Sequence, residues 1–372
     1  MQQMILIQNI LLEIANKDPE AMFVCVDGAE TVTIHELKEI FPDKVISCGI
    51  SEQNSHGIAA GLALGGKNVF LIQLGPFAVQ RTFDQLKNDI AYTNANVTIL
   101  SLKSGIKYNA TAGYSHWGIE DIALVRTLPN IEILTPASLD NLRDALDYAH
   151  KNYGPKYIRV DNYHSEFNIK PIKKTENYEL LSVGNNAVVF SIGAMTEYVY
   201  DVQNKLKNIG INITIVNCTK LKPFDKTIVE HFANKKIPMF SIEEHTYGGL
   251  ATIISEILSS YGKEVVFSPL VVNHSGYNLV GGYEYVISNV LKSNLLFENI
   301  IKLACKKYKL FNIPILTLKY AMVNNQLIKI KYTLLNIFPI LGIKQTQNRK
   351  KYYIFNIIQV LNKKINKEGK YE

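Results

Sequence analysis

The chain has 372 residues, 47% of them hydrophobic, and a formal net charge of +7. This length exceeds one ordinary domain and is ample for two buried cores. The positive charge belongs to the end of the chain, because residues 301–372 carry 15 Lys and Arg against 2 Asp and Glu and leave residues 1–300 mildly acidic. The charge balance therefore excludes nucleic acid as the expected partner of the main body.

The N-terminal segment predicts an amphipathic helix rather than a targeting or membrane segment. Its apolar run has no basic residues before it and is soon broken by Glu13, Lys17 and Asp18, which fits neither a signal peptide nor a membrane span. The cysteines lie far apart and form no C-x-x-C pair, at Cys25, Cys48, Cys218 and Cys305. Such spacing is typical of reduced thiols, so we expect a cytoplasmic protein.

Apolar runs of strand length alternate with helical patterns through residues 1–300. The first half contains MFVCVD, KVISCG, NVFLIQL, NVTILSL and IEILTP, and the second contains AVVFSIG, INITIVNC and MFSIEE. Runs rich in β-branched residues, joined by connectors of helix length, indicate parallel sheets covered on both faces. The sequence therefore predicts an α/β protein with two successive three-layer αβα domains on mostly parallel sheets. A polar stretch at 164–185 separates the domains, at about 1–170 and 176–300.

Residues 301–372 differ in kind from the rest of the chain. Three similar segments, YKLFNIPIL, YTLLNIFPIL and YYIFNIIQVL, recur in this basic and aromatic tail and suggest a small repeated unit. One interpretation is a set of strands or hairpins that pack on each other. The other is a surface that holds the protein near an acidic polymer or at an anionic membrane, peripherally on its inner face.

The stretch GISEQNSHGIAAGLALGG follows an apolar strand and opens a helix of small residues, which allows a flat ligand or a second backbone to come close. It places Glu52 near the C-terminal end of a strand, where open α/β sheets bind ligands. The alternative is a carboxylate that only complements the dipole of the helix.

The pattern G-I-x-E-Q-N before a small-residue helix resembles the pyrimidine-binding domain of transketolases, specifically the C-terminal half-chain of split, two-subunit transketolases. The resemblance continues through NVFLIQLGPFAVQRTFDQLKNDIAY and GYSHWGIEDIALVRTLPNIEILTPAS and, weakly, through residues 187–300. It implies thiamin diphosphate as the cofactor. In that family the glutamate at the position of Glu52 hydrogen-bonds the aminopyrimidine ring, so the resemblance makes Glu52 the first candidate for a catalytic residue.

The same resemblance implies further cofactor-binding residues in GPFAVQRTFDQ. Phe77 is expected to stack on the aminopyrimidine, because an aromatic plane suits a flat heteroaromatic ring. Arg81 and Gln85 are expected nearby. For Phe83 the sequence leaves two interpretations open, the wall of the cofactor site and ordinary core packing.

Two substrate-binding residues also follow from the resemblance. His116 in GYSHWGIED aligns with a catalytic histidine that contacts the hydroxyls of donor and acceptor, which suits an imidazole near neutral pH. Related sugar-phosphate enzymes commonly have Asp four residues earlier, where this chain has Ala112, so either the stereochemistry of the sugar is recognised differently or the substrate is unusual. Arg159 in GPKYIRVD aligns with an arginine that binds substrate phosphate, and a structural salt bridge is the alternative.

Thiamin diphosphate enzymes hold the diphosphate through a metal bound by a G-D-G run, and no G-D-G occurs in this chain. The resemblance therefore implies a partner, an N-terminal transketolase-like subunit that supplies the ligands for the diphosphate and for Mg²⁺. We expect an α₂β₂ heterotetramer and no metal ligands from this chain.

These patterns together predict the pyrimidine-binding subunit of a two-chain transketolase that transfers a two-carbon ketol unit between sugars. The alternatives are a 2-oxoacid dehydrogenase beta-type subunit, a decarboxylating enzyme similar to deoxyxylulose-phosphate synthase, and a catalytically silent scaffold. The tail weakly resembles segments appended to bacterial surface-polysaccharide enzymes, which implies a role in polysaccharide biosynthesis. The residues leave open whether the substrates are sugars, sugar phosphates or nucleotide sugars.

Overall fold

The structure is a computed structural model in which the chain forms two compact units. The first unit comprises residues 1–183, 188–200 and 214–293, and the second comprises residues 184–187, 201–213 and 294–372. The residues described with their side chains are 2–27, 34–162, 166–262, 264–273, 276–292 and 295–303. Beyond them, the description covers the backbone of one helix and of several strands.

A seven-stranded sheet forms the base of the first unit. Its strands lie in the order β11 (Lys220–Lys222), β5 (Glu132–Leu134), β6 (Lys156–Asp161), β4 (Val97–Ser104), β3 (Asn68–Leu74), β1 (Ala21–Cys25) and β2 (Val45–Ser47). All pairs of neighbouring strands are parallel except β11 with β5, which are antiparallel. The sheet is therefore parallel throughout its body, and a strand from later in the chain closes one edge.

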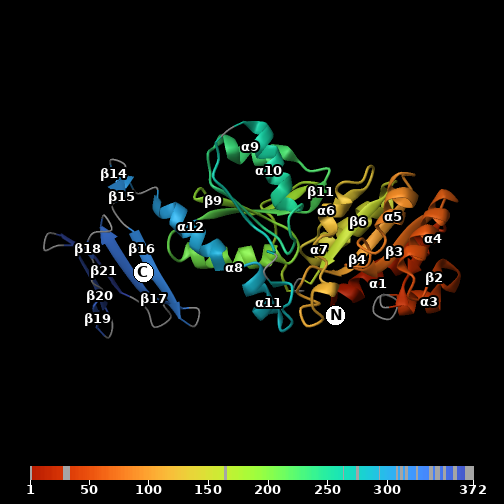
Figure 1. The fold of residues 1–372 in the computed structure, drawn as a ribbon, viewed down its shortest axis with the longest axis horizontal. Coiled ribbons are helices and arrows are strands. Elements are labelled where there is room, and N and C mark those ends of the chain that lie inside the picture. Colours follow the sequence, from red (N-terminus) through yellow and green to blue (C-terminus); the bar gives the residue numbers. More distant parts are fainter. Residues whose placement is uncertain are drawn as a thin grey trace. The chain divides into compact units, whose positions relative to one another are not determined.

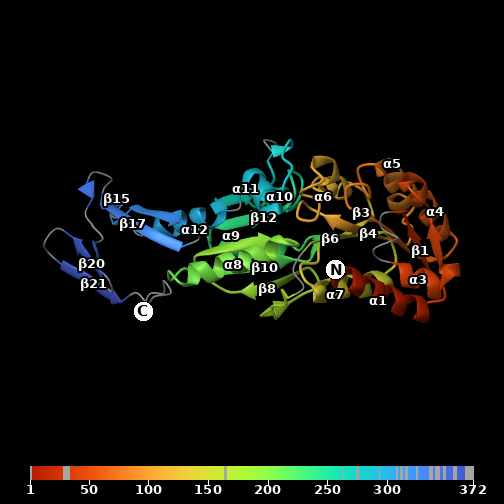
Figure 2. The same cartoon turned by 90° about the horizontal axis from the view of Figure 1, so that it is seen from below.

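Alternation along the strands divides the apolar residues between the two faces of this sheet. In β3, Phe70 and Ile72 face a cluster formed with α1 (Gln2–Lys17), α3 (His35–Ile40) and α7 (Leu139–Lys151). Figures 1 and 2 both show α1 and α7 side by side. Val69 and Leu71 face the opposite cluster, with α4 (Glu52–Leu64), η2 (Leu86–Ala91) and α6 (Asp121–Val125). Helices thus cover both faces, as predicted.

A second, six-stranded sheet also belongs mainly to the first unit. Its strands lie in the order β13 (Phe267–Leu270), β12 (Met239–Ile242), β9 (Ala187–Ser191), β10 (Ile213–Cys218), β8 (Tyr178–Ser182) and β7 (Lys173–Lys174). β12 is parallel to β9 and β13, whereas β8 is antiparallel to β7 and β10. Helices α9 (Lys226–Asn234) and α10 (Leu250–Tyr261) pack against each other and share the apolar cluster of α4. The second sheet is therefore mixed, and its core is continuous with that of the first.

The predicted α/β fold is confirmed. Each of the eight apolar runs noted in the sequence contains a strand, in chain order β1, β2, β3, β4, β5, β9, β10 and β12. The small-residue run forms α4, which begins at Glu52. Within the described residues, none of the helices combines the length and hydrophobicity that crossing a bilayer requires.

The second unit contains α12 (Asn294–Lys306) and a backbone link between its two short segments, in which the Asn186 N–H donates to the Asn212 carbonyl at 3.1 Å. The tail forms small antiparallel sheets from β14 (Lys309–Leu310), β15 (Ile313–Pro314), β16 (Thr317–Val323), β17 (Gln326–Leu334), β18 (Phe338–Pro339), β19 (Lys344–Thr346), β20 (Arg349–Ile354) and β21 (Ile358–Lys364). The tail side chains lie outside the described residues, so the membrane-surface interpretation stays a prediction.

Lys220 on β11 forms ion pairs and a hydrogen bond that link this strand to the first sheet. Its side chain is 3% exposed, and its Nζ lies 2.6 Å from Glu132 of β5 and 2.7 Å from Glu176. The same ammonium donates to the hydroxyl of Tyr148 on α7 at 2.9 Å. A strand of three residues contributes few ladder hydrogen bonds, so we expect the contacts of the buried Lys220 ammonium to contribute to the attachment of β11.

We predict that Lys220→Met lowers the free energy of unfolding by about 2 kcal/mol, because Glu132, only 21% exposed, loses its counter-charge and the hydroxyl of Tyr148 loses a donor. Urea denaturation measures the loss. Lys226→Met is the matched control, since Lys226 is 71% exposed and faces Glu230 at 3.9 Å; it should change stability by less than about 0.5 kcal/mol. Equal losses in the two variants would contradict this account of β11.

Candidate active site

Three loops meet at the edge of the first sheet where its parallel strands end. Glu52 follows β2, the loop of Phe77 and Arg81 follows β3, and the loop of His116 follows β4. The C-terminal ends of parallel strands lie on one edge, which is where open α/β sheets bind ligands. The topology therefore brings together residues that are 64 positions apart in the sequence, from Glu52 to His116.

Glu52 is the first residue of α4, and its backbone carbonyl is fixed by hydrogen bonds from three side chains. Its carbonyl accepts from the hydroxyl of Ser55 at 2.7 Å, from Nδ1 of His56 at 3.0 Å and from Nε2 of Gln73 at 3.3 Å. Because a carbonyl only accepts, Nδ1 of His56 carries the proton. Burial lowers the pKa of His56 to about 4, so this ring is neutral near pH 7. The first turn of α4 is thus anchored to β3 beneath the site.

The carboxylate of Glu52 is 8% exposed and pairs with Arg81, whose Nη1 lies 2.8 Å from Oε1. Among the described residues, Arg81 is the only one whose side chain donates to this carboxylate. The guanidinium also lies over the ring of Phe77, 4.2 Å from its centroid. Arg81 itself is 46% exposed, so it can leave this position without losing a buried environment.

His116 stands next to Phe77 from the other side. The two ring centroids are 5.4 Å apart at an interplanar angle of 77°, an edge-to-face contact. Behind His116, Trp117 is 1% exposed and donates from Nε1 to the carbonyl of Asn109 at 3.2 Å. The amide of Asn109 donates in turn to the carbonyl of His116 at 2.9 Å. His116 thus lies on a well-anchored loop.

The remaining predicted residues lie on α5 (Phe83–Gln85), which packs against α4. Phe83 is partly buried against the apolar cluster of α4, which supports the core-packing interpretation of this residue. The side-chain oxygen Oε1 of Gln85 is buried and has no donor among the described residues. An acceptor without a donor at this position suits a ligand that carries an N–H or NH₂ group.

These groups fit a flat nitrogen heterocycle. The guanidinium of Arg81 is planar, donates an N–H to Glu52 and stacks on Phe77, and a heteroaromatic ring with a protonated nitrogen presents the same features. The structure therefore brings Glu52, Phe77, Arg81 and His116 together, with Gln85 on the neighbouring helix. The chemical roles assigned to them from the sequence stay predictions.

Arg159 is buried at the base of the loop of His116, where acidic side chains and backbone carbonyls surround its guanidinium. It is 1% exposed, and Nε lies 2.9 Å from Asp121 while Nη1 pairs with Asp161. Nη2 donates to the carbonyls of Gly118 at 2.8 Å and Glu244 at 2.9 Å. Four of its five N–H groups are used inside the protein, so these contacts give no support to the expected binding of substrate phosphate, which stays a prediction. Its ion pairs with Asp121 and Asp161 support the alternative interpretation, in which Arg159 forms structural salt bridges.

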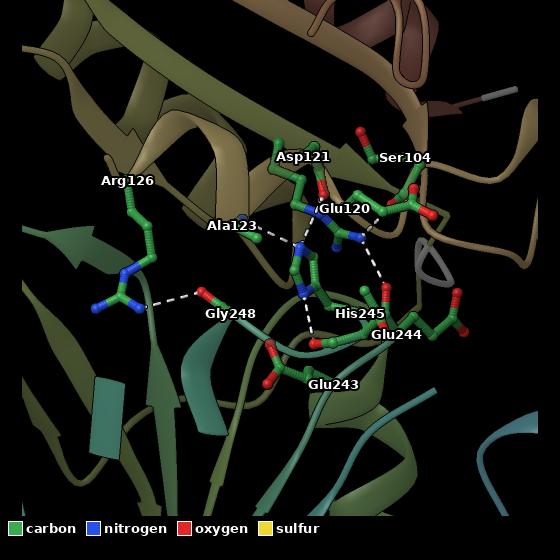
Figure 3. A network of polar contacts seen from close by, with 12 residues as sticks. Ser104, Glu120, Asp121, Ala123, Arg126, Glu243, Glu244, His245 and Gly248 are labelled. Carbon is green, nitrogen blue, oxygen red and sulfur yellow. Dashed lines mark hydrogen bonds and ion pairs between the residues drawn. The ribbon is translucent and has the colours of Figure 1, made fainter. Parts of the chain in front are cut away.

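The ion pair of Arg159 is part of a buried polar network that includes Asp121, Glu244 and His245, all three of which are labelled in Figure 3. Tyr157 on β6 donates to Oδ2 of Asp121 at 2.7 Å. His245 follows β12, and its Nε2 accepts from the N–H of Ala123 at 3.3 Å and lies 3.5 Å from Oδ1 of Asp121. Burial lowers the pKa of His245 to about 4, so it is neutral and donates from Nδ1 to the carbonyl of Thr246 at 2.8 Å.

Several residues of this network were not predicted from the sequence to be buried or to interact. Asp121 resembles an ordinary helix-start residue, and it does begin α6, but its carboxylate is fully buried. The acidic pair in SIEEH, Glu243 and Glu244, follows β12 and is also buried. One signal was available: Tyr157, Arg159 and Asp161 alternate along β6, so three polar side chains share one face of a buried strand.

Comparison with known proteins identifies the family. Residues 4–162 match the transketolase pyrimidine binding domain, and residues 176–276 match the transketolase C-terminal domain. One subunit of an apulose-4-phosphate transketolase from Actinobacillus succinogenes is 31% identical over 265 residues, which are 69% of this chain and 84% of that protein. The protein of the same name from Phocaeicola vulgatus is 30% identical over 67% of this chain and 81% of its own length. The chain belongs to the transketolase family.

Solved structures agree with this assignment. A split gene transketolase, described as an inactive beta4 tetramer, is 27% identical with a TM-score of 0.67 and aligns with 80% of this chain and 97% of its own. The transketolase of Campylobacter jejuni has the same TM-score at 16% identity, and the match covers 80% of this chain and 46% of its own, which shows the shared fold. The 1-deoxy-D-xylulose-5-phosphate synthase of Clostridium perfringens is 27% identical over 71% of this chain and 43% of the synthase.

Glu243 gives a pH test of the buried network. Its carboxylate accepts from the N–H groups of Leu250 and Ala251, each at 2.8 Å, and burial raises its pKa from 4.5 to about 7. Between these two values the folded state holds a proton that the unfolded state lacks, so this group stabilises the protein less as the pH rises. His245 acts in the opposite sense between about 4 and 6.5, because only its unfolded form is protonated there.

We predict that Glu243→Gln removes the contribution of Glu243, so the stability of the variant relative to the wild type increases from pH 5 to pH 8. The full change is on the order of 3 kcal/mol, measured by urea denaturation at each pH. Glu256→Gln is the control, since Glu256 is 58% exposed and pairs with Arg126 on the surface. A difference between Glu243→Gln and the wild type that stays constant with pH would rule out a buried carboxyl group of raised pKa.

Proposed function

We propose that this chain is the pyrimidine-binding subunit of a two-chain transketolase that uses thiamin diphosphate and transfers a two-carbon ketol unit between sugars. The observation that carries the proposal is the buried carboxylate of Glu52, paired with a planar cation that stacks on Phe77 beside His116. The membership of the transketolase family implies this cofactor. The two relatives named for apulose 4-phosphate make that compound the first donor to test.

Each residue of the candidate site would have its own role. Thiamin diphosphate, when bound, supplies a carbon nucleophile for a ketone. Glu52 would accept an N–H from the aminopyrimidine ring in surroundings that exclude water, where such a hydrogen bond is strongest. Phe77 would support the face of that ring, and Arg81 would swing aside. His116 would exchange a proton with a sugar hydroxyl, which its partly exposed position beside Phe77 allows.

A partner subunit would complete the site. Among the described side chains, no group of three His, Cys, Asp or Glu lies close enough together to hold a metal ion. We propose that an N-terminal transketolase-like subunit provides the ligands for Mg²⁺ and the diphosphate, in an α₂β₂ heterotetramer. The relative described as an inactive beta4 tetramer supports this dependence on a second chain.

We predict that the two-chain complex, reconstituted with thiamin diphosphate and Mg²⁺, turns over a ketose phosphate and that Glu52→Gln lowers kcat at least about 100-fold, the usual scale of a lost proton-transfer partner. Calorimetric titration of the complex with thiamin diphosphate should show that the variant still binds it. Glu179→Gln is the matched control: Glu179 is also buried, at 5% exposed, but accepts from Asn141 and Asn217 outside the site.

Each outcome separates the interpretations of the sequence. Full turnover in Glu52→Gln eliminates the catalytic assignment and leaves a silent scaffold as the better account. Release of CO₂ from pyruvate with transfer of the two-carbon unit to an added aldose phosphate favours the synthase-like alternative, whereas release of CO₂ with oxidative transfer to a lipoyl acceptor favours the dehydrogenase. Turnover by this chain without any partner refutes the two-chain proposal.

The tail is proposed to hold the enzyme at the inner face of the membrane, near surface-polysaccharide synthesis. Its 15 Lys and Arg against 2 acidic residues support attraction to anionic lipid. We predict that deleting residues 301–372 leaves the turnover of the complex intact and abolishes sedimentation with phosphatidylserine vesicles at low salt. Sedimentation of the chain without residues 301–372 with these vesicles would contradict the proposed membrane attachment.

A further inference from the structure

We propose that Glu244, together with Tyr283, is a positioning residue that sets the loop of His116 from the second sheet. Glu244 follows β12, whereas the loop spans Gly105 to Gly118 in the domain of the first sheet. This inference rests on the proposed role of His116. Glu244 touches no part of the proposed cofactor site and would act only through the loop.

The carboxylate of Glu244 is the acceptor at the base of the loop. It is buried, at 1% exposed, and Oε2 accepts from the N–H of Ile106 at 2.7 Å and of Lys107 at 3.2 Å. Oε1 accepts from the hydroxyl of Tyr283 at the start of α11 (Tyr283–Val290). Gly105 has φ +75°, and a Cβ on it would lie 2.7 Å from Oε2. Only glycine lets the carboxylate come this close.

Glu244 also reaches the other end of the loop. The loop is closed by a bridge between Gly105 and Gly118, with N–H to carbonyl distances of 3.0 and 3.1 Å. Nη2 of Arg159 donates to the carbonyl of Gly118 and to the carbonyl of Glu244 itself. Glu244 therefore contacts the first residues of the loop directly, and its carbonyl shares the guanidinium of Arg159 with Gly118 at the end of the loop.

A second contact holds the tip. Tyr114, two residues before His116, stacks on Tyr277 with ring centroids 4.2 Å apart and planes at 21°. Tyr277 lies between β13 and α11, so it too comes from beyond the first sheet. Within the loop, Asn109 links its base to His116 and Trp117 by hydrogen bonds. A shift at Ile106 and Lys107 is thus passed on to the imidazole.

The position of a substrate-contacting group matters at the scale of a fraction of an ångström. Glu244→Ala would remove the acceptor of the buried N–H of Ile106, of the partly buried N–H of Lys107 and of the hydroxyl of Tyr283, so the base of the loop would shift toward other partners or water. Glu244→Gln keeps the contacts, since its amide oxygen can accept from both N–H groups while its NH₂ donates to the oxygen of Tyr283. The two variants therefore separate geometry from charge.

Trp117 provides a readout that needs neither cofactor nor partner, because it is the only tryptophan of the chain and lies in this loop. We expect Glu244→Ala to shift its fluorescence to longer wavelength and to lower kcat/KM of the two-chain complex about 100-fold. Glu244→Gln should restore both values close to the wild type. Glu243→Ala is the matched control: it removes an equally buried acceptor of two N–H groups, but from α10, and should leave the emission in place.

An unchanged emission in folded Glu244→Ala, or an equal shift in Glu243→Ala, overturns the inference. If Glu244→Ala does not fold, Tyr283→Phe takes its place, because it removes one donor and no backbone partner; the emission should then move in the same direction by a smaller amount, and no movement overturns the inference. The fluorescence result stands apart from the proposed function. If Glu52→Gln retains full turnover while the emission shifts, the proposed function fails and the anchoring of the loop does not.

Discussion

The guanidinium of Arg159 lies between two buried carboxylates and two backbone carbonyls, and the meeting of the two sheets depends on it. Asp121 begins α6, Asp161 ends β6, and the carbonyl of Glu244 comes from the end of β12. A desolvated cation tolerates few other arrangements, because each missing partner leaves an uncompensated charge. Burial raises the pKa of Asp161 to about 6, and the charges of Glu244 and Asp121 add to this rise while the guanidinium of Arg159 opposes it. Such a cluster specifies one geometry more than it adds stability.

This geometry reaches the candidate site through one loop. Gly118 accepts from Arg159, and the same residue closes the loop that presents His116. The part of the chain that forms the second sheet therefore supports the candidate site, although it contributes no predicted catalytic group to it.

Much of the fold and of the site was predictable from the sequence, for local reasons. Strand runs and the small-residue helix are set by alternation and composition over a few residues, and Glu52, Phe77, Arg81 and His116 lie in recognisable stretches at strand ends. The role of Arg159 was not predictable in this way. Whether an arginine meets a phosphate or a carboxylate depends on residues such as Asp121 and Glu244, far away in the sequence. The three-residue strand β11 gives no periodicity at all.

The pairing of Arg81 with Glu52 shows how the site can be stable before any ligand arrives. A buried carboxylate needs a donor, and the guanidinium supplies one while it covers the exposed face of Phe77. A ligand that takes its place must offer both a donor and an aromatic face, which few small molecules do. The exchange therefore favours ligands that combine these two properties.

The position of β11 in the chain has a consequence for synthesis on the ribosome. The rest of the first sheet is complete at Asp161, but its edge strand begins only at Lys220. At the usual rate of translation the edge of β5 waits roughly 3 to 12 s for its neighbour. An open strand edge invites pairing with other nascent chains, and a charged residue on it is a common safeguard. Glu132 lies on that edge, and its charge would disfavour pairing with other chains until Lys220 is synthesised and binds it.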